Sequence, residues 1–115
     1  MKDDRIYLQH IRDSIGRILE YTSGGPDEFI HDNKIQDAVI RNLEIIGEAV
    51  KHLSDDLRNP NSDIPWKQIA GMRDELIHEY FGVDIRIVWN VIEHHLPALK
   101  EKIDGLLKNM APPKS

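Results

Sequence analysis

Residues 32–57, DNKIQDAVIRNLEIIGEAVKHLSDDL, carry the strongest structural signal in the chain. Apolar residues recur here every three or four positions, which is the spacing of one face of an α-helix. They are Ile35, Val39, Leu43, Ile46, Val50, Leu53 and Leu57. Asp32 is a residue type that caps helix N-termini, and the turn-forming run NPNS at 59–62 closes the segment. We therefore expect one long amphipathic helix.

The same spacing occurs on both sides of this segment. Residues 4–22 show helical periodicity up to the run SGGP at 23–26, where glycine and proline end a helix. A third periodic segment begins at Pro65, a residue suited to the first turn of a helix, and continues to Tyr80 before Gly82. Two further amphipathic helices are expected from these patterns.

A last periodic segment runs from Asp84, a candidate cap, to Leu106 and crosses Pro97. Proline lacks the backbone N–H of a helix interior, so we expect a kink or a restart at that point. No stretch alternates polar and apolar residues as a strand would. The sequence predicts an all-α fold, an antiparallel up-and-down bundle of four to five helices.

Length and composition set further limits. The 115 residues fit one domain, which we expect over 1–110, with a disordered tail at 111–115 because of its two prolines. The chain has no cysteine, no signal-peptide pattern and no apolar run of membrane-spanning length, so a cytoplasmic location is expected. The net charge of −5 works against unspecific nucleic-acid binding, which depends on neutralising phosphates.

The segment GMRDELIHEY at 71–80 contains the residues best suited to chemistry. Asp74 and His78 are four positions apart and share a helix face, so the carboxylate can accept a proton from the imidazole and orient it. Arg73 can hold phosphate oxygens and stabilise charge in a transition state, while His78 can move a proton near neutral pH. RNA supplies its own nucleophile, the 2′-hydroxyl.

The same residues also fit a purely structural role. An Arg, an Asp and a His on an exposed helix face commonly form a solvated, salt-bridged surface. Tyr80 lies in register with the apolar positions Ile69 and Leu76, as a half-buried core tyrosine would. Spacing alone leaves both interpretations open. The sequence indicates no metal site and no cofactor, because His94 and His95 are adjacent and make a poor ligand pair.

The string RDELIHEY at 73–80 resembles the Arg, four residues, His, one residue, Tyr motif of HepT toxins, which belong to the HEPN superfamily of ribonucleases. The flanks resemble the same family: 36–49 its second helix, 64–73 the approach to the motif, and 83–89 the start of the next helix. The resemblance spans roughly residues 5–107.

This resemblance implies a specific function. It implies a HEPN-like bundle that forms homodimers, with Arg73 and His78 of both subunits as catalytic residues in one cleft. The implied activity is a metal-independent endoribonuclease, in which the 2′-hydroxyl attacks the adjacent phosphate. The implied partner is a cognate MntA-type nucleotidyltransferase antitoxin of a type VII-like toxin–antitoxin system, which inhibits the toxin by transferring AMP to Tyr80.

One position departs from the family pattern, and two other functions stay open. Many relatives carry Asn directly after the motif arginine, whereas this chain has Asp74 as its supporting residue, and a carboxylate lowers the local positive potential. The main alternative is a non-catalytic helical partner that binds substrate for a nucleotidyltransferase, with Arg73 and His78 holding phosphate. The other is a structural dimerisation module.

Overall fold

The computed structural model describes residues 3–78 and 82–110, and every regular element in these ranges is helical. The elements are α1 (Asp4–Tyr21), α2 (Pro26–His31), α3 (Asn33–Lys51), α4 (Asp55–Arg58), the 3-10 helix η1 (Asn59–Asn61), α5 (Trp66–His78), α6 (Ile85–His94) and α7 (Leu96–Asn109). The predicted all-α class is confirmed.

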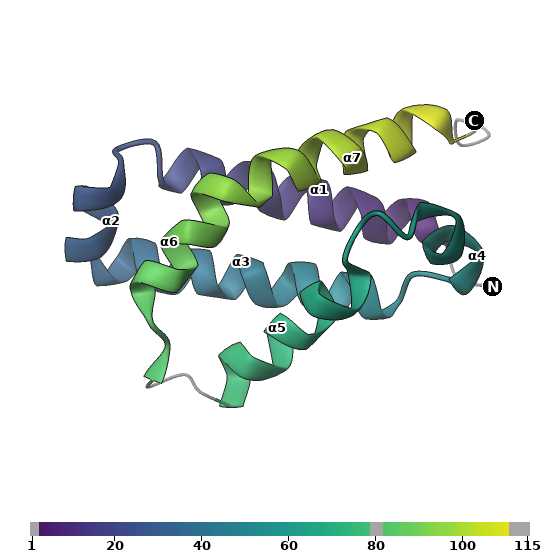
Figure 1. Ribbon diagram of the computed structural model, residues 1–115. Coiled ribbons are helices and arrows are strands. Elements are labelled where there is room, and N and C mark those ends of the chain that lie inside the picture. The colour runs from purple at the N-terminus through teal and green to yellow at the C-terminus, as the bar shows by residue number, and fades with distance from the viewer. Residues whose placement is uncertain (1–2, 79–81, 111–115) are drawn as a thin grey trace.

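Within the described ranges, the five helices of ten or more residues make up the bundle (Figure 1). Helices α1 and α3 lie side by side and run in opposite directions, α7 packs along α1, and α5 packs against α3. Helix α6 connects the α5 side of the molecule to α7, and the start of α1 lies at the same end of the bundle as the end of α7. This is the predicted up-and-down arrangement.

The core is formed mainly by the apolar faces that the sequence predicted, to which Phe29 of α2 is added. The side chains with no solvent exposure include four from α1, two from α3, one from α2 and one from α7: Leu8, Ile11, Ile15, Ile18, Val39, Ile46, Phe29 and Ile103. Burial of each such side chain contributes on the order of 1.5–3 kcal/mol relative to its exposed state. None of the helices in the described ranges is both long and apolar enough to cross a bilayer.

Two predicted helix caps and the predicted restart are confirmed. The Asp32 carboxylate accepts hydrogen bonds from the backbone N–H groups of Lys34 (2.9 Å) and Ile35 (3.2 Å), at the start of α3. Asp84 accepts one from the Arg86 N–H at 2.9 Å, at the start of α6. Helix α7 begins anew with Pro97 in its first turn, where the missing N–H costs no hydrogen bond.

The segment 32–57 is not one helix. Helix α3 ends at Lys51, and the Asp4 carboxylate of α1 then accepts hydrogen bonds from the backbone N–H of Ser54 (2.8 Å) and from its hydroxyl. Ser54 in turn caps α4 by accepting from the Leu57 N–H at 3.2 Å. The chain therefore turns where α1 binds it, a long-range contact that periodicity does not reveal.

Helix α2 was not predicted, because its six residues are too few to show a period and only Phe29 is buried. The expected disordered tail at 111–115 lies outside the described residues, as does Tyr80.

Gly47 sets the distance between α3 and α5. A Cβ atom at this position would lie 2.5 Å from the Cβ of Arg73 and 3.1 Å from the carbonyl oxygen of Ile69. The backbones can therefore approach this closely only because position 47 has no side chain. The absence of a side chain at Gly47 thus allows the predicted site residue Arg73 to pack directly against α3.

We expect Gly47→Ala to lower the free energy of unfolding by about 1–3 kcal/mol, because overpacking outweighs the gain in helix propensity. Gly71→Ala is the matched control: it lies in α5, and a Cβ atom added there would have no neighbour within 4 Å. That variant should gain roughly 0.5–1 kcal/mol. Urea denaturation followed by circular dichroism measures both. A Gly47→Ala protein as stable as Gly71→Ala would contradict the close approach.

Candidate active site

Helix α5 carries three of the four predicted site residues, Arg73, Asp74 and His78. Its first residue, Trp66, is buried and donates a hydrogen bond from its indole N–H to the carbonyl of Asn61 at 3.0 Å. This contact and the close approach at Gly47 fix the helix at two points.

The Arg73 guanidinium lies between two carboxylates. Its Nε is 2.8 Å from Oε2 of Glu48 on α3, and its Nη1 is 3.0 Å from Oδ1 of Asp74. The side chain is one third exposed, at 33%. A guanidinium carries several N–H donors in a planar fork, so these two contacts leave others that a phosphate oxygen can accept from.

Asp74 bridges Arg73 to a second cation. Lys51 Nζ, at the end of α3, is 2.8 Å from the same Oδ1 atom that Arg73 contacts. These hydrogen bonds, first from Lys51 and then from Arg73, lower the pKa of the Asp74 carboxyl below its ordinary value. Asp74 is therefore ionised at neutral pH.

The expected contact between Asp74 and His78 does not form, although both residues lie in the described part of the chain. The carboxylate binds the two cations instead, since an ammonium or guanidinium donor makes a stronger hydrogen bond than a neutral imidazole. His78 lies in the last described turn of α5 and is exposed. Its ring is accessible to a ligand from solvent without being oriented by Asp74.

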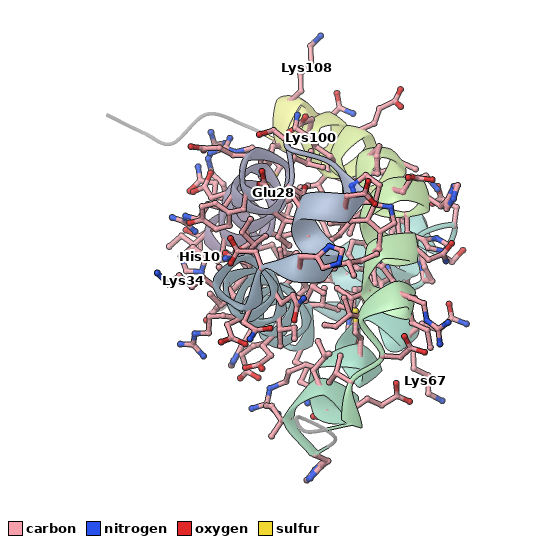
Figure 2. The ribbon with its side chains drawn as sticks, turned by 90° about the vertical axis from the view of Figure 1, so that its left-hand side faces the viewer. His10, Glu28, Lys34, Lys67, Lys100 and Lys108 are labelled. Atoms are coloured by element: carbon pink, nitrogen blue, oxygen red, sulfur yellow. The ribbon has the colours of Figure 1, made fainter. Side chains whose placement is uncertain are left out.

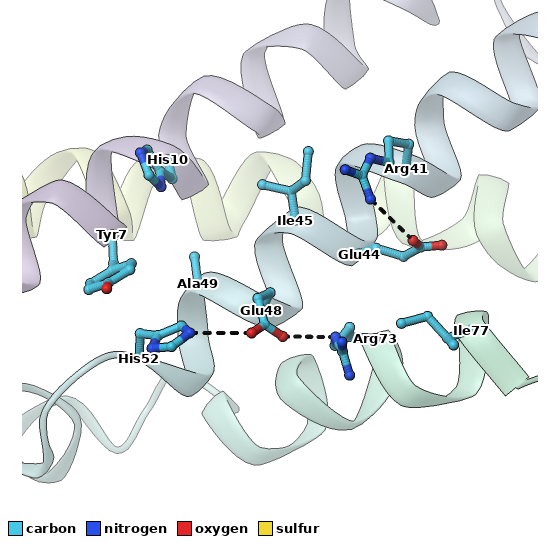
Figure 3. A pocket seen from close by; sticks show the side chains of 10 residues that line it. All are labelled: Tyr7, His10, Arg41, Glu44, Ile45, Glu48, Ala49, His52, Arg73 and Ile77. Atoms are coloured by element: carbon cyan, nitrogen blue, oxygen red, sulfur yellow. Dashed lines mark hydrogen bonds and ion pairs between the residues drawn. The ribbon is translucent and has the colours of Figure 1, made fainter.

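A cavity of about 310 Å³ lies beside Arg73, between α1, α3 and α5 (Figure 3). We call it the α1–α3–α5 cavity; its walls are Tyr7, His10, Arg41, Glu44, Ile45, Glu48, Ala49, His52, Arg73 and Ile77. His78 does not line it but follows Ile77 directly. The cavity joins residues far apart in sequence to the predicted arginine.

Aromatic rings form one wall of this cavity. Tyr7 and His52 are stacked, with ring centroids 5.0 Å apart and ring planes 13° from parallel. His10 meets Tyr7 edge-on, at 6.1 Å and 88°. His52 Nε2 is also 3.2 Å from Glu48 Oε1, so Glu48 connects the stacked pair to Arg73. Figure 3 shows this His52–Glu48–Arg73 chain.

Sequence reasoning did not identify Tyr7, Glu48, Lys51 or His52. The Glu48–His52 pair has the four-residue spacing of a helical ion pair and could have been found. Lys51 and Tyr7 contact residues that lie far away in the sequence, so no local spacing pattern predicts these contacts.

The ion-paired side chains around Arg73 comprise two cations and two anions. Arg73 and Lys51 are each paired with a carboxylate, Glu48 or Asp74. Elsewhere Lys34, Lys67 and Lys108 point outward from different sides of the bundle (Figure 2). A phosphate bound at Arg73 must therefore compete with Glu48 and Asp74 for the N–H donors of the guanidinium.

The sequence comparisons identify the family. The family model described as "Ribonuclease HepT-like" matches residues 11–106. This range contains α5 and both of the predicted catalytic residues, Arg73 and His78. The chain belongs to the HepT-like ribonuclease family, and the predicted family is confirmed.

Several curated proteins are similar over most of the chain. A Thermococcus cleftensis protein named "Probable ribonuclease HepT" is 46% identical over 103 residues, covering 89% of this chain and 94% of its own length. A Caldanaerobacter subterraneus subsp. tengcongensis protein named "Putative RNase" is 45% identical, covering 94% of this chain and 97% of its own.

A longer relative also matches. The Methanocaldococcus jannaschii protein named "Gamma-glutamylcyclotransferase and putative RNase" is 47% identical over 110 residues. The match covers 95% of this chain but spans only 50% of that protein's length. No solved structure matches the chain significantly.

Proposed function

We propose that this protein is a metal-independent endoribonuclease, the toxin of a type VII-like toxin–antitoxin system. The observation that carries the proposal is the position of Arg73, part-exposed beside an open cavity, with the exposed His78 in the last described turn of the same helix. Membership of a ribonuclease family supports RNA as the substrate.

The proposed reaction is an internal transfer at one phosphate of RNA. The 2′-hydroxyl oxygen forms a bond to phosphorus and loses its proton, while the bond from phosphorus to the 5′-oxygen breaks and that oxygen takes up a proton. His78 serves in proton transfer, and Arg73 binds the phosphate oxygens as charge accumulates on them. The products are a cyclic phosphate end and a free 5′-hydroxyl.

We propose a homodimer as the active form, with Arg73 and His78 of both copies facing one cleft. Two imidazoles would allow one ring to accept the 2′-hydroxyl proton while the other donates to the leaving oxygen. Light scattering should give twice the chain mass of 13.3 kDa. An active, stable monomer at micromolar concentration would contradict this.

The proposed partner is an MntA-type nucleotidyltransferase that transfers AMP to Tyr80. The motif places this tyrosine two positions after His78. A phosphate attached there would bring negative charge close to the proposed site, where it would occupy arginine donors and repel RNA.

The protein freed of any partner should cleave a labelled RNA in the presence of EDTA and leave cyclic phosphate ends. Activity lost in EDTA and restored by magnesium would overturn the metal-independent mechanism. RNA binding without cleavage would favour the alternative, a non-catalytic subunit that presents substrate to a nucleotidyltransferase.

A further inference from the structure

We propose that the α1–α3–α5 cavity binds one unpaired base of the RNA, next to the phosphate held by Arg73. This inference rests on the proposed function, because it takes Arg73 as the phosphate-binding residue. The cavity would make the enzyme select single-stranded RNA, since a base can enter it only when it is unstacked and unpaired.

The wall of the cavity has the composition of a base-binding site. Tyr7 and His52 stack on each other through one face each, and the opposite face of such a ring can stack on a base. The pair is already ordered, because Glu48 holds the imidazole from one side and the Tyr7 ring covers it from another. Binding a base would therefore cost little further side-chain entropy.

The rest of the lining fits a flat molecule with apolar faces and polar edges. Ile45 and Ile77 supply apolar surface, and Ile77 is 43% exposed. Glu44 adds a carboxylate that contacts Arg41 only at 3.9 Å, so its oxygens can still accept from an N–H group on a base edge.

The charges of the lining suit a neutral base as the occupant. The lining contains two carboxylates, Glu44 and Glu48, and two arginines, so its formal charges cancel and it offers a neutral base no net charge to oppose it. The cations Arg73 and Lys51 lie at one side, where the phosphate is expected. The base and the phosphate of one nucleotide are joined through the sugar, so a cavity that Arg73 itself lines is within reach of that base.

The test is RNA binding by the His78→Ala protein, which prevents cleavage during the measurement. Fluorescence anisotropy with a labelled single-stranded oligoadenylate should show binding weakened about 5- to 150-fold when Tyr7→Leu is added, the range expected for losing one base–aromatic stack. Tyr7→Phe keeps the ring and should bind within about twofold of the parent.

An abasic oligomer with the same backbone is the control ligand. It should bind weakly and equally to the parent and to Tyr7→Leu, because only the base uses the ring. Equal loss on both ligands, or no loss on oligoadenylate, would overturn the proposal. If Tyr7→Leu does not fold, His52→Ala replaces it, with His52→Phe as the variant that restores a ring.

Two results separate this inference from the proposed function. If cleavage requires Arg73 and His78 but Tyr7→Leu binds RNA normally, the cavity is not a base site and the ribonuclease assignment stands. If the wild-type protein binds RNA through Tyr7 but does not cleave it, the base site stands and the catalytic assignment fails. A dimer that becomes monomeric in Tyr7→Leu would identify the cavity as a protein interface and overturn the inference.

Discussion

Replacing either Arg73 or His78 by alanine should lower the rate of RNA cleavage at least about 100-fold while leaving the protein folded. Loss of one preorganised charge-stabilising group lowers a rate about 100- to 1000-fold, and loss of a general acid or base about 100- to 10,000-fold. Single-turnover cleavage of a labelled RNA, with enzyme in excess, measures these rates separately from product release.

The contacts of Arg73 indicate why its removal should not unfold the chain. Glu48 retains its contact with His52 at 3.2 Å, and Asp74 retains Lys51 at 2.8 Å. Neither carboxylate is left without a partner, and both are about half exposed. An unchanged circular dichroism spectrum and melting temperature would verify this. Cleavage that survives both alanine substitutions would refute the catalytic assignment.

Asp74→Asn is the matched control for charge. It removes the carboxylate that both Arg73 and Lys51 contact and keeps nearly the same side-chain size. We expect cleavage to be kept and RNA affinity to rise, because two cations then face the phosphate with one carboxylate fewer. A loss of activity comparable to that of His78→Ala would mean that Asp74 itself takes part in the reaction.

The elements that could be predicted from the sequence depend on local rules. The apolar stripes of α1 and α3, the caps at Asp32 and Asp84 and the restart before Pro97 all follow from residues within a few positions of one another. The break after Lys51 does not, since it depends on Asp4 binding Ser54 across 50 positions.

The candidate site also has some features that follow from local rules and others that depend on contacts between distant segments. The motif placed Arg73 and His78 on one helix, but their surroundings depend on how α5 packs on α3. Lys51 reaches Asp74 across 23 positions and takes the carboxylate that the four-residue spacing assigned to His78. A local spacing rule identifies which side chains share a helix face. It does not identify which side chains of a neighbouring helix compete for the same hydrogen-bonding group.

Tyr80→Phe should leave a folded protein that the proposed nucleotidyltransferase partner cannot modify. Tyr80 lies outside the described residues, so this prediction stands on the motif and on chemistry. In AMP transfer the phenolic oxygen loses its proton and attacks the α-phosphate of ATP, and pyrophosphate leaves. Phenylalanine lacks that oxygen while keeping the ring. If Tyr80 were only a core residue, the change would cost about 1 kcal/mol for any hydrogen bond of its hydroxyl and nothing else.

The two roles are separated by incubating each protein with the partner, ATP and magnesium and then measuring intact masses. Wild type should gain one or more AMP increments and lose its RNA cleavage, whereas Tyr80→Phe should gain none and stay active unless the partner inhibits it by binding alone. Tyr7→Phe is the matched control, since it removes a different phenol and should be modified as wild type is. Equal modification of Tyr80→Phe and wild type, or a modified peptide that lacks Tyr80, would show that this tyrosine is not the acceptor.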